Sequence, residues 1–145
     1  MRDFTLRAAV ETNQGHIRSL IHRAGINPLG LRWRRFIVAE LADGTFAGCG
    51  QLKPHKDGSL ELASLAVEEK VQGLGIARGL MKRLMADGTP PLYLMCRPGL
   101  QSLYEKFGFR VIGMDAMPPY FRSISRLMRM LSFGRHAGPL VMRLE

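Results

Sequence analysis

A chain of 145 residues with 46% apolar residues and a formal net charge of +9 suits one soluble globular domain that buries its own core. No apolar run reaches the length of a membrane span, the N-terminus lacks the apolar segment of a signal peptide, and the four histidines and two cysteines are not grouped at zinc spacing. Because Cys49 and Cys96 fall in predicted strands, we expect them to be free thiols in a reducing cytoplasm. Because no zinc spacing occurs, we expect no metal.

The positive charge predicts an anionic partner, because a basic surface attracts anions and raises their encounter rate. A polyphosphate ligand, a nucleic acid and an anionic lipid surface all meet this description. A basic surface that is merely solvated is the alternative.

Hydrophobic periodicity and turn residues predict alternating strands and helices. Thr12 is the expected N-cap of the first helix, and Asp43-Gly44 is a hairpin signal. In chain order the predicted elements are a strand at 3–8, a helix from about 12 to 23, strands at 35–41, 45–53 and 60–67, a helix at 74–85, a strand at 92–96, a helix at 97–107, and strands at 109–112 and 138–144.

The turn between the strand at 60–67 and the next helix reads Gln72-Gly73-Leu74-Gly75-Ile76-Ala77. Free backbone N–H groups gather at such a helix start, and the positive end of the helix dipole lies behind them. Gly73 and Gly75 carry no side chain that would keep a phosphate from these groups. The turn therefore predicts an anion site, most simply for a pyrophosphate, with a turn that binds nothing as the alternative. It matches neither the P-loop nor the dinucleotide fingerprint.

This turn resembles motif A of the GNAT superfamily of acetyl-CoA-dependent N-acetyltransferases, [QR]-x-x-G-x-[GA], with Gln72, Gly75 and Ala77 at its fixed positions. The segment 103–109, Leu-Tyr-Glu-Lys-Phe-Gly-Phe, resembles the family's motif B, Y-E-K-x-G-F. The resemblance covers about residues 3–112 and the last strand. It implies one α/β (α+β) GNAT domain over 1–145, a mixed six- to seven-stranded sheet with helices on both faces, and a helical insertion at about 114–137.

The resemblance implies acetyl-CoA as co-substrate and no metal. The strand segment at 65–67 would hold the pantetheine arm, and the amides of 73–78 would hold the pyrophosphate. The expected cofactor-binding residues are Leu65, Ala66, Val67, Gln72, Gly73, Leu74, Gly75, Ile76, Ala77, Arg78 and Tyr104.

Acetyl transfer to an amine needs a donor for the developing oxyanion and an acid for the leaving thiolate. By resemblance, a bulge in the strand frees the Leu65 amide for the first role, and Tyr104 of motif B takes the second. A phenol with a pKa near 10 is protonated at pH 7. The alternative is that Tyr104 is a core residue with its hydroxyl at the rim. Arg97 stands where the family often has an asparagine facing the coenzyme.

Glu61 is the expected base, because it lies six residues before Val67, the spacing found in the histone-acetylating branch of the family. A carboxylate among apolar neighbours can work near neutral pH. Glu61 as an exposed strand charge, a water chain as base, and Glu68 or His55 as base are the alternatives.

Arg32 and Trp33 are candidates for the acceptor wall, since that segment often lines the acceptor pocket in the family; a tryptophan that caps the core is the alternative. The residue pattern of the insertion at about 114–137 predicts a basic amphipathic helix. It either covers the acceptor, with Tyr120 as a contact, or forms a dimer contact, fills another structural role or touches a membrane. Its apolar positions are Tyr120, Phe121, Ile124, Leu127, Met128 and Leu131, largely opposite Arg122, Ser125, Arg126 and Arg129.

Together these features predict an N-acetyltransferase that moves an acetyl group from acetyl-CoA to a primary amine, on a small molecule or a protein, by direct attack in a ternary complex. A non-catalytic acyl-CoA sensor and a basic nucleic-acid-binding module are the alternatives. No helix-turn-helix or RNP pattern supports the latter, so we expect no nucleic acid partner. Membrane association is not expected, and a homodimer, common in the family, stays open.

Overall fold

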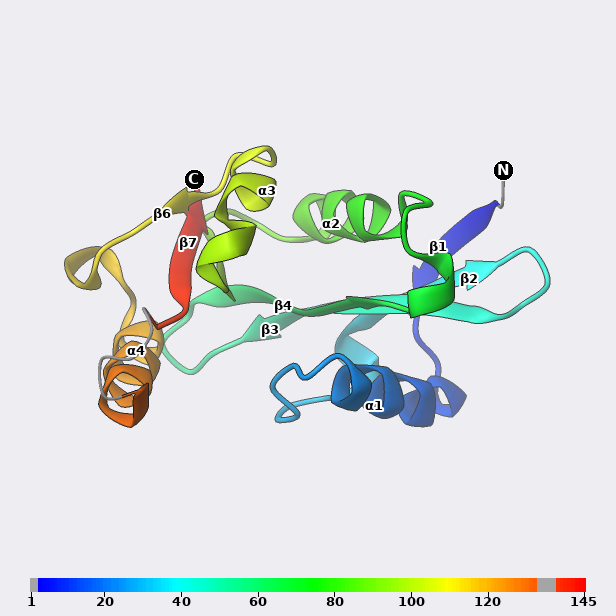
Figure 1. Ribbon diagram of the computed structural model, residues 1–145, viewed down its shortest axis with the longest axis horizontal. Coiled ribbons are helices and arrows are strands. Elements are labelled where there is room, and N and C mark those ends of the chain that lie inside the picture. The colour runs from blue at the N-terminus through cyan, green and yellow to red at the C-terminus, as the bar shows by residue number, and fades with distance from the viewer. Residues whose placement is uncertain (1–2, 133–137) are drawn as a thin grey trace. The chain divides into compact units, whose positions relative to one another are not determined.

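The computed structural model describes residues 3–132 and 138–145 of the chain (Figure 1). Seven strands form a mixed sheet whose hydrogen-bonded order is β1-β2-β3-β4-β5-β7-β6. The strands are β1 (Phe4–Ala8), β2 (Phe36–Leu41), β3 (Phe46–Pro54), β4 (Leu60–Val67), β5 (Leu92–Cys96), β6 (Arg110–Val111) and β7 (Leu140–Leu144). The α-helices are α1 (Gln14–Arg23), α2 (Ile76–Asp87), α3 (Gln101–Glu105) and α4 (Pro119–Ser132).

The chain divides into two compact units. Unit 1 comprises Met1–Lys53 and Leu62–Gly88, and unit 2 comprises Pro54–Glu61 and Thr89–Glu145. Strands β3 and β4 therefore each contribute residues to both units.

In unit 1, helices α1 and α2 cover opposite faces of the strands, as Figure 1 shows. The side-chain alternation of β3 explains this arrangement. Cys49 points into the core beneath α1, which includes Ile17 and Ile21. Gly48 and Gly50 face the other way, because a Cβ on either would meet leucine side chains of α2. The predicted sheet with helices on both faces is confirmed here.

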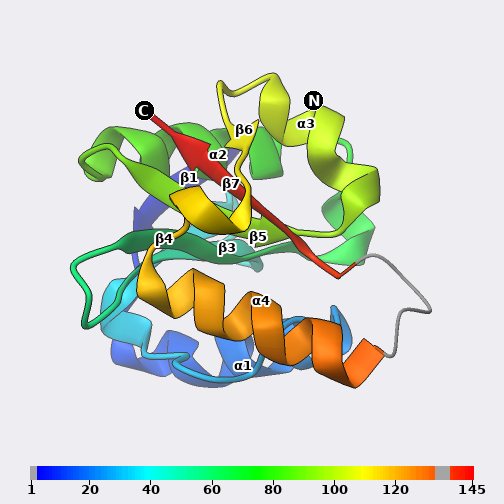
Figure 2. The same ribbon diagram turned by 90° about the vertical axis from the view of Figure 1, so that its left-hand side faces the viewer.

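In unit 2, β5 pairs with β4 in parallel at Leu60↔Leu92 and Glu61↔Tyr93, and with β7 in antiparallel fashion. Helices α3 and α4 lie on opposite sides of the β5–β7 pair (Figure 1, Figure 2). A core of Tyr93, Met117, Phe121 and Val141 forms on the α4 side.

The start of α1 differs from the prediction of Thr12 as N-cap, which is wrong. A 3-10 turn, Glu11–Asn13, precedes the helix, and Asn13 is the residue before its first turn. The buried Asn13 side chain accepts hydrogen bonds from Val10 N at 2.9 Å and from Arg7 Nη1 at 3.0 Å. These bonds fix the turn, so the α-helix begins two residues after Thr12.

Candidate active site

The turn between β4 and α2 has the backbone geometry of an anion-binding loop. Gly73 and Gly75 both have φ of +86°, which favours glycine, and a Cβ on either would meet no described atom within 4 Å. The first helical hydrogen bond runs from Gly79 N to Gly75 O at 3.0 Å. The N–H groups of residues 76–78 therefore precede the helical ladder and are available to a ligand.

Gln72 and Arg78 lie on the two sides of this turn. The exposed Gln72 donates from Nε2 to the carbonyl oxygen of Val67 at 3.3 Å, which ties the turn to the end of β4. Arg78 is exposed in the first turn of α2 and adds positive charge beside the free amides. Leu74 is half-buried, Ile76 is buried and Ala77 is exposed.

Strand β4 is irregular where the sequence predicts the oxyanion donor. Ser64 has φ of +57°, a left-handed backbone inside a strand, and it immediately precedes Leu65. This conformation is typical of a β-bulge, which re-aims neighbouring backbone groups. Leu65 and Val67 are half-buried and Ala66 is buried. The irregularity supports the prediction for the Leu65 amide, which stays a prediction.

Gln51 is a residue that our sequence reasoning missed. It is fully buried on β3, and its Nε2 donates to Ser64 Oγ at 2.8 Å and to Gly30 O at 3.2 Å. Its Oε1 has no hydrogen-bond partner among the described residues. The available signal was a glutamine inside the mostly apolar run of β3.

The acceptor-wall candidates lie in unit 1, where Arg32 precedes the 3-10 turn Trp33–Arg35 and Trp33 begins it. Trp33 packs, partly buried, against the core beneath α1, and its N donates to Gln14 Oε1 at 2.9 Å. The guanidinium of Arg34 lies 4.7 Å from the centre of the Trp33 ring. Arg32 is exposed. Trp33 therefore does pack on the core, and an acceptor contact stays a prediction.

In unit 2, three of the candidate residues come together around His55. His55 Nε2 lies 2.8 Å from Glu61 Oε1, and both residues are largely buried. The Tyr120 ring stacks on the His55 ring with 3.5 Å between centroids. The expected base, one of its alternatives and the expected acceptor contact thus form one cluster. Glu61 is a buried, hydrogen-bonded carboxylate, so the reading as an exposed strand charge is wrong.

A turn aspartate anchors α4 to this cluster. Asp57 Oδ2 accepts from Tyr120 N at 2.9 Å, and Asp57 Oδ1 accepts from the side chain and backbone of Ser59. These bonds, the Ser59 hydroxyl first, lower the pKa of Asp57. Burial raises the pKa of Tyr120, and the Glu61 carboxylate adds to the rise. A cavity of 530 Å³ adjoins the cluster and includes His55, Asp57 and Tyr93 in its wall.

Tyr104, the expected acid, lies on α3 of unit 2 and is half-buried. Burial raises the pKa of its phenol, and the neighbouring Cys96 adds to the rise. The hydroxyl is therefore protonated at neutral pH, as the proposed role requires.

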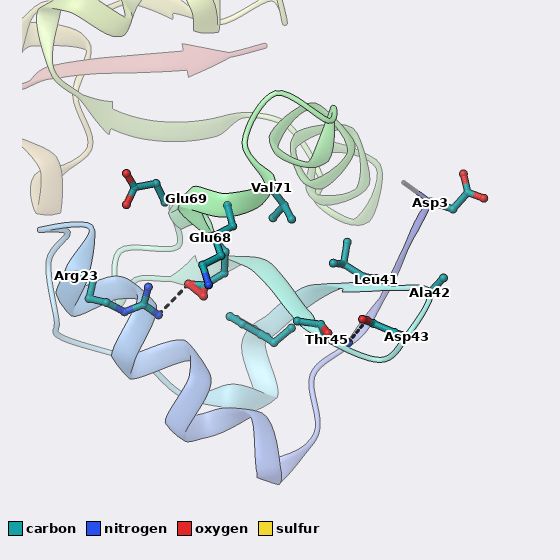
Figure 3. Close-up of a pocket in the computed structure, with 11 residues that line it drawn as sticks. Asp3, Arg23, Leu41, Ala42, Asp43, Thr45, Glu68, Glu69 and Val71 are labelled. Atoms are coloured by element: carbon teal, nitrogen blue, oxygen red, sulfur yellow. Dashed lines mark hydrogen bonds and ion pairs between the residues drawn. The ribbon is translucent and has the colours of Figure 1, made fainter. Parts of the chain in front are cut away.

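Another cavity, of 800 Å³, lies in unit 1 near the β2–β3 hairpin (Figure 3). Its lining is rich in carboxylates, and Figure 3 shows Glu68 joined to Arg23, with 2.8 Å between Oε1 and Nη2. Glu68, an alternative base, is thus engaged in an ion pair. None of the expected catalytic or cofactor-binding residues lines this cavity. The lining residues are Asp3, Arg23, Leu41, Ala42, Asp43, Thr45, Phe46, Glu68, Glu69, Lys70 and Val71.

Helix α4 buries a narrower face than its apolar pattern predicts. Phe121 is fully buried, and Ser125, expected on the polar side, is buried one turn later with its Oγ 3.5 Å from Met117 Sδ. The placement of Ser125 on the solvent side is therefore wrong, because residues four apart share a helix face. Leu127, Met128, Met130 and Leu131 are exposed.

Two negative findings hold for residues 3–132 and 138–145. No group of three or more His, Cys, Asp or Glu side chains is placed to hold a metal ion. No helix in those ranges combines the length and the apolar character that a bilayer crossing requires.

Solved structures share this fold. N-acetylglutamate synthase from Neisseria gonorrhoeae, complexed with coenzyme A and N-acetyl-glutamate, has 25% sequence identity and a TM-score of 0.75, covering 99% of this chain and 35% of its own. Rv2747 from Mycobacterium tuberculosis, in complex with CoA and NLQ, has 21% identity and a TM-score of 0.75, covering 97% and 98%. The ribosomal-protein-S18-alanine N-acetyltransferase from Escherichia coli has 19% identity and a TM-score of 0.67, covering 98% and 93%. The chain thus spans about a third of the length of the synthase.

Comparison with curated protein sequences found no match. The family model described as an acetyltransferase (GNAT) domain matches residues 32–111, which is more than half of the chain and includes the glycine turn, β4 and Tyr104. This match agrees with the seven-stranded sheet, and the chain belongs to the GNAT acetyltransferase family.

Proposed function

We propose that this protein is an N-acetyltransferase that transfers an acetyl group from acetyl-CoA to a primary amine. The observation that carries the proposal is the turn before α2, where two positive-φ glycines leave the first helix amides open. The family match and the CoA complexes among similar folds support it.

Acetyl-CoA supplies an activated acyl group as a thioester. In the proposed reaction the amine nitrogen bonds to the carbonyl carbon, and the carbon–sulfur bond breaks. The Leu65 amide donates to the carbonyl oxygen as that oxygen gains charge. Glu61 removes the proton that the attacking nitrogen loses, and Tyr104 protonates the leaving sulfur.

The amides of residues 76–78 and the Arg78 side chain are proposed to bind the pyrophosphate of acetyl-CoA. This part of the proposal is tested by placing alanine at Gly73 or Gly75. Each substitution places a Cβ at positive φ, and the Cβ stands where a phosphate would approach.

Gly44 offers a matched control, because it has φ of +88°, meets no described atom within 4 Å and lies at the β2–β3 hairpin. Gly44→Ala therefore carries a similar backbone cost, about 1 kcal/mol, without touching the turn. Titration calorimetry should show acetyl-CoA binding at least about tenfold weaker for Gly73→Ala and Gly75→Ala, and unchanged for Gly44→Ala.

Turnover is measured in parallel as thiol release with a panel of amines. Binding with release for one amine class supports the proposal. Binding without release for every amine class would favour an acyl-CoA sensor, and no binding at all would leave the turn without a ligand.

A further inference from the structure

Ser64 adopts a backbone conformation that its own chemistry disfavours. Among the residues that the structure describes, it is the only non-glycine residue with a positive φ, and it lies within a strand. A side chain in this region costs free energy, so the conformation persists only where surrounding contacts impose it.

Two residues of β3 hold Ser64 in place. Gln51 Nε2 donates to Ser64 Oγ at 2.8 Å, and Cys49 Sγ lies 3.6 Å from the Ser64 carbonyl oxygen. Cys49 and Gln51 are two positions apart on a strand, and both are fully buried. The Gln51 bond is the stronger of the two, because a thiol is a weak donor.

The Gln51 amide also reaches the loop after α1. Its Nε2 donates to Gly30 O at 3.2 Å, and Lys53 Nζ donates to Leu29 O at 3.0 Å. This loop leads directly to Trp33, the proposed acceptor wall. One side chain therefore joins the loop before the wall to the irregular residue before Leu65.

We propose that Gln51 is a positioning residue, whose amide imposes the left-handed backbone of Ser64 and thereby sets the direction of the Leu65 amide. The inference rests on the proposed function, in which that amide receives the developing oxyanion. The unpartnered Oε1 of Gln51 argues against a purely stabilising role, because a buried acceptor without a donor is unfavourable.

The test substitutes Gln51 by methionine, which has a similar shape and no N–H donors. We expect Gln51→Met to lower kcat about 10- to 100-fold. The KM for acetyl-CoA should stay close to that of the wild type, while the midpoint of urea unfolding should fall, because Ser64 Oγ and Gly30 O lose their donor. A wild-type kcat in the folded variant would overturn the inference.

A second substitution provides a rescue that a merely structural role would not give. Glycine adopts positive φ without steric cost, so Ser64→Gly added to Gln51→Met should recover at least part of kcat. Gln14→Met is the matched control, because Gln14 bonds Leu31 O and Trp33 N in the same loop region and is not bonded to Ser64. It should alter the acceptor KM and leave kcat within about threefold. Failure of the rescue would count against the inference.

A spectroscopic arm keeps this test separate from the proposed function. In amide NMR spectra, Gln51→Met should shift the Ser64 and Leu65 signals, whereas Gly73→Ala should leave them in place. Absence of turnover in the wild type would refute the proposed function without affecting this arm. Unchanged Ser64 and Leu65 signals in Gln51→Met would refute the positioning role even in an active enzyme.

Discussion

His55 Nε2 lies 2.8 Å from Glu61 Oε1, and the two side chains are only 8% and 11% exposed. A buried carboxyl group with a hydrogen bond to a neighbouring side chain is held in one orientation, which a general base requires. The stacked ring of Tyr120 covers the histidine, so α4 is coupled to the proposed base.

Glu61→Gln should lower kcat by about 10²- to 10⁴-fold, because the amide does not take up the amine proton. Acetyl-CoA binding should stay unchanged, since the proposed pyrophosphate contacts are elsewhere. Rates with both substrates saturating and calorimetric titration measure the two effects. Glu11→Gln, the same change at an exposed position, is the control. Equal rates for the two variants would remove Glu61 as the base.

Tyr104→Phe should lower kcat about 10- to 100-fold, because the leaving sulfur loses its proton donor. Burial raises the pKa of Tyr104, so the phenol stays protonated as the pH rises to about 10 and beyond. In the wild type, the fall of kcat that follows ionisation of the Tyr104 phenol should therefore lie above pH 10. The same fall should be absent from Tyr104→Phe. Tyr93→Phe, a buried tyrosine in the same unit, should keep the wild-type profile. A Tyr104→Phe rate like that of Tyr93→Phe would contradict the assignment.

Tyr120→Ala should raise the acceptor KM about tenfold and leave the acetyl-CoA KM unchanged, if α4 covers the acceptor as predicted. Deleting the whole insertion is a poorer test, because its Phe121 belongs to the core of unit 2. Tyr120→Phe keeps the stacked ring and should behave like the wild type. Initial rates over a grid of both substrates separate the two KM values, and an unchanged acceptor KM in Tyr120→Ala would exclude the contact.

Cys49 should make the fold sensitive to alkaline pH. Burial raises the pKa of its thiol from 9.0 to about 12, with a further contribution from the Glu68 carboxylate. The folded state thus favours the neutral thiol. The resulting stability is complete below pH 9 and is lost between pH 9 and 12, up to roughly 4 kcal/mol at 1.36 kcal/mol per unit. Between pH 8 and 11, the free energy of unfolding measured with urea should fall more steeply for the wild type than for Cys49→Ala. Parallel curves would show that the thiol does not contribute.

The sequence predicts the local elements of this fold well, because strand alternation, helical spacing and glycine turns depend on residues that are close together in the chain. The Asp43-Gly44 hairpin and the turn at Gly73 and Gly75 lie where they are predicted, and the helix after the turn begins and ends two residues later than the predicted 74–85. The Thr12 cap fails because Asn13 competes for the same role with a buried side chain.

Local sequence patterns do not predict the long-range contacts of this fold. The bond of Gln51 to Ser64 depends on the register of two neighbouring strands, which a shift of one residue would abolish. Likewise, β7 enters the sheet between β5 and β6, an order that no local pattern encodes. His55 and Glu61, considered separately as bases, prove to be one hydrogen-bonded pair.

The exposed end of α4 has a chemical consequence of its own. Met130 is 71% exposed and Met128 is 41% exposed, whereas Met81 and Met142 are buried in the two units. Peroxide should therefore convert the two helix thioethers to sulfoxides well before it reaches the core. The added oxygens would make two exposed apolar positions of this helix polar, while the buried methionines of the two units keep their thioethers.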